Sequence, residues 1–188
     1  MSDCKTLCRC PWPRYDALLM DYHDHRWCRP VHDDDELFAL LVLESFSVGL
    51  SWTLILHREA LFRSACDGLR PALCAAYGPD KEEALMALPG MIHHREKIRS
   101  IGENARAFLA VQKEHGSFDH FLWQHVDGQP VDHRPETLAD VPARTALSEQ
   151  LSRELKHYGF RYMGPVITYS YMQAAGLVND HLLSCAFR

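Results

Sequence analysis

The chain has 188 residues, enough for one domain with a substantial core, and its 47% hydrophobic and 24% charged residues are typical of a soluble globular protein rather than a disordered one. A formal net charge of −5 does not indicate a general nucleic-acid binder, although a local basic face can still contact phosphates. No apolar run approaches the roughly 20 residues that span a bilayer, and MSDCKTLCRC lacks the apolar core of a signal peptide, so we expect a cytoplasmic protein without a membrane segment.

Helical spacing of apolar residues recurs along the chain, whereas alternating β-branched runs are almost absent, so the sequence predicts an all-α fold. Asp33 to Asp35 can begin a helix that Gly49 ends, with Glu44 on its largely apolar stripe. Further helices are predicted from Ser51 through Phe62 and over Pro71 to Tyr77, Asp80 to Leu88, His94 to Lys113, Phe118 to His125, Ala146 to His157 and Pro165 to Val178. The polar, proline-rich segment DGQPVDHRPETLADVP, from Asp127, is predicted to be an exposed loop.

The seven cysteines favour free thiols or metal ligands, because their number is odd and no secretory signal accompanies them. His181 and Cys185 are four residues apart, so they can face one zinc ion from a helical turn. The N-terminal segment could supply the remaining ligands from Cys4, Cys8, Cys10, His23 and His25. Chance spacing without a metal is the alternative, and chemistry alone does not choose among these candidates.

The segment LPGMIHHREKIRSIGENARAF, from Leu88, has a glycine-containing turn between an apolar helix and a basic one, a pattern typical of a helix-hairpin-helix. Backbone N–H groups in such a hairpin can meet a DNA phosphate, with Arg95, Lys97 and Arg99 adding positive charge. The alternative is an ordinary helix connection with a solvated basic face.

An aromatic pocket with one acid is the third candidate feature. Trp12, Tyr22, Trp27 and Trp52 could stack on a planar base, and Glu44 could favour a positively charged one. Alternatively, the aromatic side chains belong to the core and Glu44 makes a structural hydrogen bond.

Several blocks coincide, in order and spacing, with one known family. They are CPW from Cys10, YHDHRW from Tyr22, LESFSVGLSW from Leu43, IHHREKI from Ile92, and YGFRYMGP to GLVNDH near the C-terminus. Over nearly its whole length the chain resembles the DNA-3-methyladenine glycosylase I family. The resemblance implies a helix-hairpin-helix DNA glycosylase-like fold, with residues 1–188 forming one domain of two helical lobes.

The same resemblance implies one structural zinc ion that joins the N- and C-terminal segments through Cys10, His23, His181 and Cys185. Cys4 and Cys8 lie outside the matched spacing and would belong to a small N-terminal extension.

The resemblance further implies excision of an alkylated purine, such as 3-methyladenine, after the nucleotide is flipped out of duplex DNA. Glu44 matches the base-recognising acid of the family, and Tyr22 and Trp52 match its stacking aromatics. We expect the base-binding residues to be Tyr22, Trp52, Trp12, Phe46 and Leu19, and the DNA-binding residues to be Gly49, Leu50, Pro89, Gly90, Ile92, Arg95 and Lys97. No aspartate occurs between Asp80 and Asp119, which agrees with a subfamily that lacks the catalytic aspartate of the wider superfamily.

Several positions depart from the usual pattern of the family, among them Cys28, Glu96 and two positions expected at the pocket. Leu19 stands where relatives have a second pocket tyrosine, and Phe46 begins the Phe-Ser-Val segment that stands where they have a polar pair and an alanine. Both changes predict a drier and less selective pocket.

Three hypotheses follow for the function. The first is a monofunctional, monomeric DNA-3-methyladenine glycosylase whose partner is double-stranded DNA that contains an alkylated purine. The second is a DNA-binding helix-hairpin-helix module that has lost excision activity. The presence of Glu44, Tyr22 and Trp52 argues against this second hypothesis. The third is a zinc hydrolase, which four protein ligands disfavour because they leave no position for a water molecule.

Overall fold

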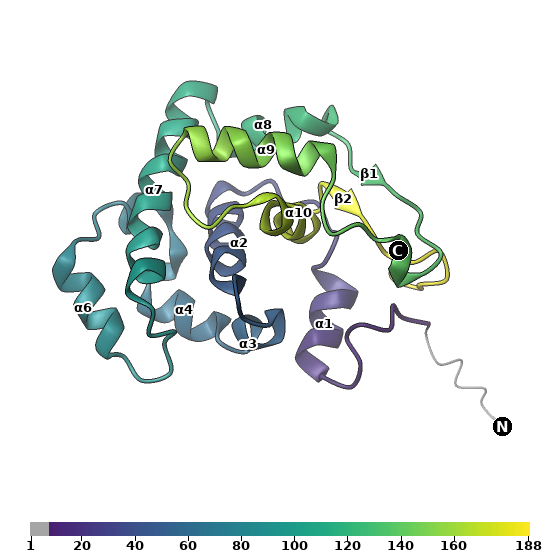
Figure 1. Cartoon of the computed structure of the whole chain (residues 1–188), viewed down its shortest axis with the longest axis horizontal. Helices are drawn as coiled ribbons and strands as arrows, with labels where there is room; N and C mark the ends of the chain where they lie inside the picture. Colours follow the sequence, from purple (N-terminus) through teal and green to yellow (C-terminus); the bar gives the residue numbers. More distant parts are fainter. Residues whose placement is uncertain (1–7) are drawn as a thin grey trace.

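The structure is a computed structural model that describes residues 8–188 and is mostly helical, as the sequence predicts (Figure 1). Cys4, one of the candidate zinc ligands, lies outside the described residues, and Cys8 is exposed. Within the described range, none of the helices combines the length and apolar composition needed to cross a membrane.

The α-helices are α1 (Ala17–His25), α2 (Asp34–Ser47), α3 (Trp52–Leu56), α4 (Glu59–Ala65), α5 (Pro71–Cys74), α6 (Pro79–Ala87), α7 (Arg95–His115), α8 (Phe118–Trp123), α9 (Ala146–His157) and α10 (Pro165–Ala174). The short 3-10 helices are η1 (Asp67–Leu69), η2 (Gln124–Val126) and η3 (Leu138–Asp140). The short strands β1 (Val131–Asp132) and β2 (Val178–Asn179) pair in parallel.

Helix α2 lies at the centre of the fold, between α7 and α10 (Figure 1). The side chain of Asp33 accepts a hydrogen bond from the amide of Glu36 and so caps the first turn. All ten residues from Leu37 to Phe46 are buried, as expected for a helix that other elements surround. Burial on all sides places Glu44 inside the protein although its side chain is ionisable.

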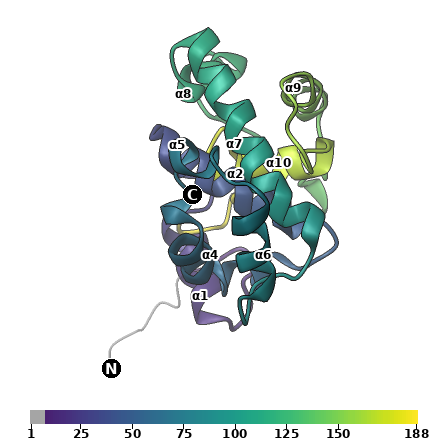
Figure 2. The ribbon, with the colours of Figure 1, turned by 90° about the vertical axis from the view of Figure 1, so that its left-hand side faces the viewer.

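Helices α6 and α7 form the predicted pair of helices on either side of the LPGM turn. Figure 2 shows α6 and α7 beside each other, with α9 and α10 on one side of the molecule and α5 on the opposite side. Helix α7 is amphipathic and packs its apolar face against α2, α5 and α8. The turn between α6 and α7 is therefore held by a long helix that also reaches the core.

The C-terminal segment lies beside the first described residues of the chain (Figure 1). The amide of Ala186 donates to the carbonyl oxygen of Cys8 at 2.8 Å, and the Arg29 guanidinium donates to the carbonyl oxygen of Phe187, also at 2.8 Å. A small apolar cluster that includes Leu19, Trp27 and Leu182 fills the space between these segments.

Some element boundaries differ from the prediction for local reasons. The helix expected from Ser51 through Phe62 is two helices, because a tighter turn at His57 and Arg58 separates α3 from α4. Helix α10 ends at Ala174 rather than Val178, since Gly176 has a φ of +76° and a Cβ atom there would lie 2.2 Å from the Arg29 carbonyl carbon.

Helix α1 and the β1–β2 pair are absent from the sequence-based prediction. The Asp16 side chain caps α1 by accepting from the amides of Leu18 and Leu19, each at 3.0 Å. The predicted loop from Asp127 to Pro142 is largely exposed, and η3 within it approaches the cavity described below.

Candidate functional site

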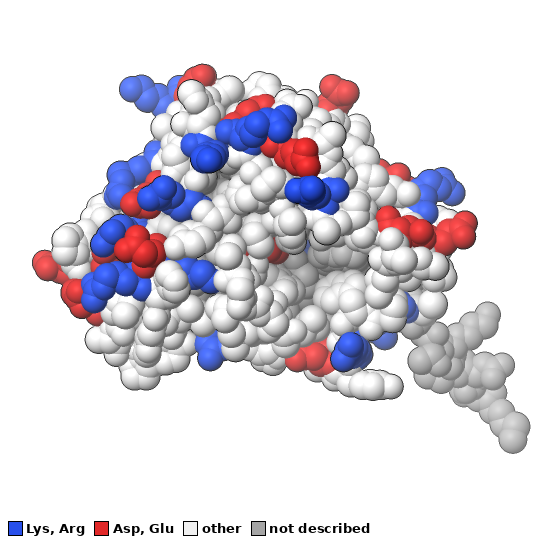
Figure 3. Space-filling view, viewed as in Figure 1, with Lys and Arg blue, Asp and Glu red and all other residues white. Residues whose placement is uncertain are grey.

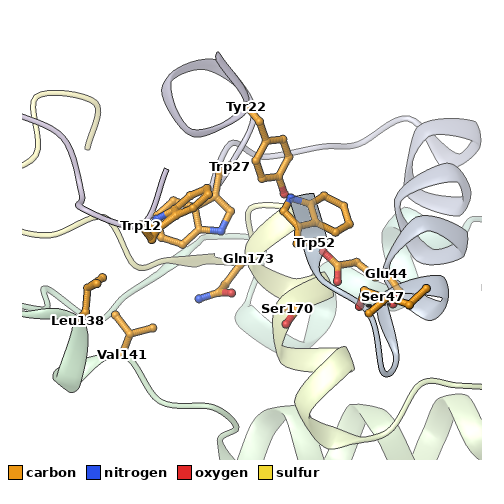
Figure 4. Close-up of a pocket in the computed structure, with 11 residues that line it drawn as sticks. Trp12, Tyr22, Trp27, Glu44, Ser47, Trp52, Leu138, Val141, Ser170 and Gln173 are labelled. Carbon is orange, nitrogen blue, oxygen red and sulfur yellow. Dashed lines mark hydrogen bonds between the residues drawn. The ribbon is translucent and has the colours of Figure 1, made fainter. Parts of the chain in front are cut away.

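A cavity of about 360 Å³ opens between α1, α2, α3, α10 and the η3 loop. Its walls combine large aromatic, small polar and apolar side chains, as ligand-binding cavities commonly do. The lining residues are Trp12, Tyr22, Trp27, Glu44, Ser47, Leu50, Trp52, Leu138, Val141, Ser170 and Gln173, and Figure 4 shows them around one hollow.

Glu44 is the acidic residue of this cavity, and Figure 4 shows its carboxyl group pointing into the hollow beside Trp52. The residue is only 4% exposed, and no hydrogen-bond donor or cation of residues 8–188 contacts its carboxyl oxygens. Burial raises the pKa of Glu44 to about 8. A cation in the cavity would supply the missing counter-charge and favour the carboxylate.

The aromatic side chains meet at the mouth and wall of the cavity. The ring centroids of Tyr22 and Trp52 are 5.3 Å apart, and those of Trp12 and Trp27 are 5.1 Å apart with an edge-to-face angle of 71°. The indole N–H groups of Trp12 and Trp52 are buried and find no acceptor in the described part of the chain. These rings offer planar surfaces for stacking, whereas the two indole N–H groups are covered by protein and are not open to the cavity.

Gln173 adds an oriented amide to the cavity wall. Its Nε2 donates to Asp180 Oδ2 at 2.8 Å, and the Tyr169 hydroxyl donates to the same oxygen at 2.6 Å. Asp180 is fully buried, so the amide nitrogen of Gln173 is committed and the amide oxygen is left for a donor from a ligand. Sequence reasoning did not identify Gln173, although it lies on a predicted helix.

Two expected base-binding residues do not line the cavity. Phe46 is two positions after Glu44 on α2, which turns its side chain to the other side of the helix, where it packs edge-to-face against Phe62 at 4.7 Å. Leu19 packs with Trp27 and Leu56 in the small apolar cluster behind the aromatic wall. The expectation of direct contact was therefore wrong for both residues. Leu138 and Val141 also line the cavity without having been expected, because they come from the predicted loop and carried no sequence signal.

The residues around the α6–α7 turn fall into exposed and buried groups. Pro89 and Gly90 are exposed, Ile92 is half-buried, and Gly90 has a φ of +84° that suits the tight turn. The amides of Gly90, Ile92 and His93 meet no acceptor among residues 8–188. These amides are therefore available to an external acceptor.

The two cations expected to bind DNA differ in position. Arg95 is exposed and forms an ion pair with Glu83. Lys97 is only 4% exposed, and its Nζ donates to the carbonyl oxygens of Phe46 at 2.9 Å and Val48 at 2.5 Å. The expectation that Lys97 contacts DNA was wrong, because its ammonium group is turned inward and caps the end of α2.

The end of α2 also places Gly49 and Leu50, two residues that the resemblance predicts to bind DNA. Gly49 has a φ of +74° and turns the chain from α2 toward α3. Leu50 follows at the edge of the cavity with 38% of its surface exposed.

A second cluster consists of two cysteines and two histidines from the N- and C-terminal segments of the chain. The side chains of Cys10, His23, His181 and Cys185 are buried, and one donor atom of each lies within 4.8 Å of the others. Cys185 Sγ is 3.4 Å from His181 Nδ1 and 3.6 Å from His23 Nε2, and Cys10 Sγ is 3.8 Å from His181 Nδ1. Ligands at ordinary Zn–S and Zn–N lengths lie about 3.4–3.8 Å apart around a tetrahedral zinc ion, so these residues fit that metal.

The groups around this cluster also suit metal binding. His23 Nδ1 donates to Asp24 Oδ1 at 2.7 Å and His181 Nε2 to the Trp27 carbonyl oxygen at 3.2 Å, which leaves the other ring nitrogen of each free for a metal. Arg9 in turn binds the Asp24 carboxylate at 2.8 Å. His25, another candidate from the sequence, is not part of the cluster.

Comparison with known proteins gives a consistent set of relatives. The model of the methyladenine glycosylase family matches residues 12–188. DNA-3-methyladenine glycosylase 1 of Escherichia coli (strain K12) is 39% identical over 177 residues, covering 94% of this chain and 95% of that protein. DNA-3-methyladenine glycosylase of Haemophilus influenzae (strain ATCC 51907 / DSM 11121 / KW20 / Rd) is 37% identical over 177 residues, covering 94% and 96%. A solved structure of 3-methyladenine DNA glycosylase I from Staphylococcus aureus, which concerns 3-methyladenine recognition, superposes with a TM-score of 0.93 at 37% identity and covers 95% of each chain.

Proposed function

Because the chain belongs to the methyladenine glycosylase family and is a DNA glycosylase, we propose that it hydrolyses the N-glycosidic bond of 3-methyladenine, or of a closely related alkylated purine, flipped out of duplex DNA into the cavity. The observation that carries the proposal is the carboxyl group of Glu44, which is buried in an aromatic cavity without a counter-charge in the described chain. A purine methylated at N3 within DNA carries positive charge and supplies that counter-charge.

The aromatic wall supports the choice of a planar base. Tyr22 and Trp52 present their rings to the hollow from one side, and Trp12 and Trp27 present theirs from another (Figure 4). Stacking on such rings is worth roughly 1–3 kcal/mol per base and tolerates any planar ligand. A cation near a ring face adds about 0.5–2 kcal/mol, which a neutral adenine would not receive. Charge is thus the basis on which the cavity selects the damaged base.

Polar groups of the cavity can fix the orientation of the base. Glu44 and the amide oxygen of Gln173 can accept hydrogen bonds from a ligand. An adenine derivative carries both an exocyclic amino donor and ring-nitrogen acceptors. The two acceptors of the cavity match the amino donor, which supports an adenine derivative rather than a purely apolar ligand.

The chemical step needs little from the protein beyond this binding. The bond between the sugar C1′ and the base nitrogen breaks, and its electron pair stays with the base, which becomes neutral. Water forms the new C1′–O bond and loses a proton to solvent. Rigid binding of the extruded cationic base, with Glu44 beside it, favours the bond-breaking geometry. The described cavity wall contains no lysine that could form a Schiff base, which supports a monofunctional enzyme.

The four buried Cys and His residues would hold one zinc ion with a structural role. Zinc bound by Cys10, His23, His181 and Cys185 would supply stability rather than reactivity, because four protein ligands complete a tetrahedral site. His23 directly follows Tyr22 on α1, so fixing His23 also fixes the cavity wall. Zinc would therefore join the ends of the chain and position the aromatic ring of Tyr22.

The duplex would be held at the α6–α7 turn. The free amides of Gly90, Ile92 and His93 can donate to phosphate oxygens, and exposed Pro89 leaves the turn accessible. Leu50, at the edge of the cavity, is placed to fill the space that the extruded nucleotide leaves in the duplex. Phosphate contacts of this kind are independent of base sequence, as damage searching requires.

The test is an excision assay with methylated duplex DNA and chromatography of the released bases. We expect release of 3-methyladenine, and we expect the phosphodiester backbone to stay intact until alkali cleaves it at the abasic sites. Duplex binding without release of any base would favour a binding module, and strand cleavage without alkali would contradict the monofunctional mechanism.

A further inference from the structure

A buried carboxyl group that the proposed chemistry does not use, that of Asp180, lies directly behind the cavity wall. Its residue is fully buried, yet three donors converge on its two oxygens. Gln173 Nε2 and the Tyr169 hydroxyl donate to Oδ2 at 2.8 Å and 2.6 Å, and His133 Nδ1 donates to Oδ1 at 2.7 Å. Of these three donors, Gln173 also lines the cavity. The carboxyl group therefore acts on the cavity through Gln173.

The carboxylate of Asp180 determines which end of the Gln173 amide faces the cavity. A carboxylate oxygen only accepts hydrogen bonds, so the atom of Gln173 that contacts it must be the amide nitrogen. The amide oxygen then meets no donor among residues 8–188, and Figure 4 shows the amide group projecting from α10 into the hollow. A group that both donates and accepts in the place of this carboxylate would allow the amide either orientation.

The surroundings of Gln173 hold the rest of the residue equally firmly. Its carbonyl oxygen accepts from the Cys28 amide at 2.9 Å, and Cys28 Sγ accepts from the Asp180 amide at 3.4 Å. Tyr169 lies one turn before Gln173 on α10, and His133 follows β1 in the segment that leads to η3. The cluster thus joins α10 to the loop that forms another wall of the cavity, and it leaves the Gln173 amide little freedom to turn.

Charge alone does not distinguish one alkylated purine from another. Adenine and guanine nucleotides methylated at N3 are both cations, so the carboxyl group of Glu44 favours both, and aromatic stacking tolerates any planar base. Figure 3 shows a central hollow whose rim is mostly uncharged, and Glu44 is the only acid or base of the Lys, Arg, Asp and Glu types in the described cavity lining. A neutral group with a fixed orientation is therefore needed for this choice.

We propose that Asp180 is a positioning residue for base selection, because it holds the Gln173 amide nitrogen and so presents the amide oxygen to the substituent at C6 of the extruded purine. The inference rests on the proposed function and names the feature of the substrate that the cavity recognises. An amino group at C6 donates to this oxygen, whereas a carbonyl group at C6 would place two acceptors against each other. The cavity thus prefers alkylated purines of the adenine type.

The test compares two free bases that differ at C6, 3-methyladenine with its amino group and 3-methylhypoxanthine with its carbonyl group. Tryptophan fluorescence measures both dissociation constants, and their ratio reports the preference. An unpaired buried polar group weakens binding by about 5- to 150-fold, so the wild type should prefer 3-methyladenine by at least this factor. Gln173→Leu removes the amide oxygen and should reduce the ratio by about 5- to 150-fold. An unchanged ratio in this variant would overturn the inference.

Asp180→Asn tests the positioning role itself, because an asparagine can donate to Gln173 as well as accept from it. We expect this variant to reduce the ratio although Gln173 is still present. In the Gln173→Leu background it should change the ratio no further, as required if Asp180 acts through Gln173. A purely structural defect would instead weaken the binding of both bases equally and leave the ratio unchanged. Tyr169→Phe is the matched control, since it removes another hydrogen bond of the cluster but keeps the carboxylate, and it should keep the wild-type ratio.

Asp180 directly precedes His181 of the buried Cys and His cluster, so zinc content and unfolding temperature are measured for each variant. If Asp180→Asn does not fold, NMR spectroscopy of the wild type tests the orientation of the amide. The side-chain amide protons of Gln173, assigned by their absence in Gln173→Leu, should show NOEs to the ring of Tyr169 and none to bound 3-methyladenine. NOEs from these protons to the base would overturn the inference.

Excision of 3-methyladenine from methylated duplex DNA separates this inference from the proposed function. If the wild type releases 3-methyladenine but the ratio stays unchanged in Gln173→Leu or in folded Asp180→Asn, the inference fails alone. If the wild type releases no base from methylated DNA and binds neither free base, the proposed function fails and the inference fails with it.

Discussion

Lys97 and Phe46 link α7 to the helix that carries the buried acid. The ammonium group of Lys97, near the start of α7, donates to the carbonyl oxygen of Phe46 at 2.9 Å and to that of Val48 at 2.5 Å. These carbonyls belong to the last turn of α2, where intrahelical donors are missing. The lysine therefore caps α2 between Glu44 and Leu50, and it fixes the end of α2 to the helix that follows the α6–α7 turn.

Replacing Lys97 tests this structural role. We expect Lys97→Ala to lower the free energy of unfolding by about 1–3 kcal/mol, since two buried carbonyl groups lose a charged donor. Lys97→Met, which retains most of the side-chain volume, should be destabilised for the same reason. Denaturant unfolding measures the effect, with Arg99→Ala, an exposed cation two residues later, as the control. A variant of unchanged stability that loses most of its duplex affinity would instead indicate direct DNA contact.

The sequence predicted the helical fold well because local signals agree with packing over most of the chain. Helix α9 has the predicted bounds, and α2 has the predicted Asp33 cap. Prediction failed where distant residues determine the boundary. The end of α10 depends on the close approach of Gly176 to the Arg29 backbone, which is far away in the sequence.

The sequence identified the acidic residue and the aromatic residues of the cavity, but it did not identify all of the other lining residues. Glu44 and Trp52 line the cavity as expected, whereas Phe46 follows Glu44 so closely on α2 that it must face away. Leu138 enters the wall from a loop whose path no periodicity predicts, and Gln173 is distinguished only by its bond to Asp180. From the sequence, Lys97 was expected to be an exposed basic residue. Nothing in the composition around it indicates that its side chain points inward.

The proposed zinc site predicts a stability effect specific to its ligands. Cys185→Ala should lose stoichiometric zinc and lower the free energy of unfolding by several kcal/mol, because binding of a structural metal is coupled to folding. Elemental analysis and thermal unfolding measure the two effects. Cys74→Ala removes another buried thiol, one outside the cluster, and should keep its zinc. Full zinc content in Cys185→Ala would refute the assignment.

The aromatic wall should contribute through stacking. Trp52→Phe keeps a ring but removes the indole N–H, whereas Trp52→Leu removes the ring as well. We expect the leucine variant to lose about 1–3 kcal/mol of base binding and the phenylalanine variant to lose less. Titration with free 3-methyladenine measures both, and Trp123→Phe serves as a control because Trp123 lies outside the cavity. Equal affinities for all these proteins would exclude stacking on Trp52.

Glu44 should matter for excision rather than for duplex binding. A hydrogen bond to a charged group contributes about 1.5–3 kcal/mol, so Glu44→Ala should slow release of 3-methyladenine by about 10- to 150-fold or more and leave affinity for undamaged duplex unchanged. Glu44→Gln retains the shape of the side chain without its charge and distinguishes charge from shape. Ser170→Ala changes another cavity wall residue and should have a small effect. Undiminished release by Glu44→Ala would contradict the assigned role.

The same carboxyl group should also make stability depend on pH. In the unfolded chain Glu44 loses its proton near its usual pKa of 4.5, whereas burial raises the folded-state pKa to about 8. Between these values the folded protein binds more protons than the unfolded chain, so the contribution of Glu44 to stability becomes less favourable as pH rises through this window. The full difference corresponds to roughly 5 kcal/mol as an upper limit.

Glu44→Gln removes this titration and should therefore be more stable than the wild type at alkaline pH. We expect the two proteins to have similar free energies of unfolding near pH 4.5, and the advantage of the variant to grow with pH and level off above about 8. Denaturant unfolding from about pH 3.5 to about pH 9 measures the difference, in which titrations common to both proteins cancel.

Glu59→Gln is the matched control, because the pKa of Glu59 is lowered in the folded protein whereas that of Glu44 is raised. Burial opposes ionisation of Glu59, but hydrogen bonds and ion pairs with Arg26 and Arg63 hold its pKa below the usual range. Its carboxylate therefore stabilises the fold fully above the usual pKa of 4.5, and this contribution is lost as the pH falls through the lowered folded-state pKa. Relative to the wild type, the glutamine variant should thus lose stability as the pH rises toward 4.5 and change little above it. A difference between Glu44→Gln and the wild type that stays constant with pH would show that the buried acid has a neighbour that already neutralises it.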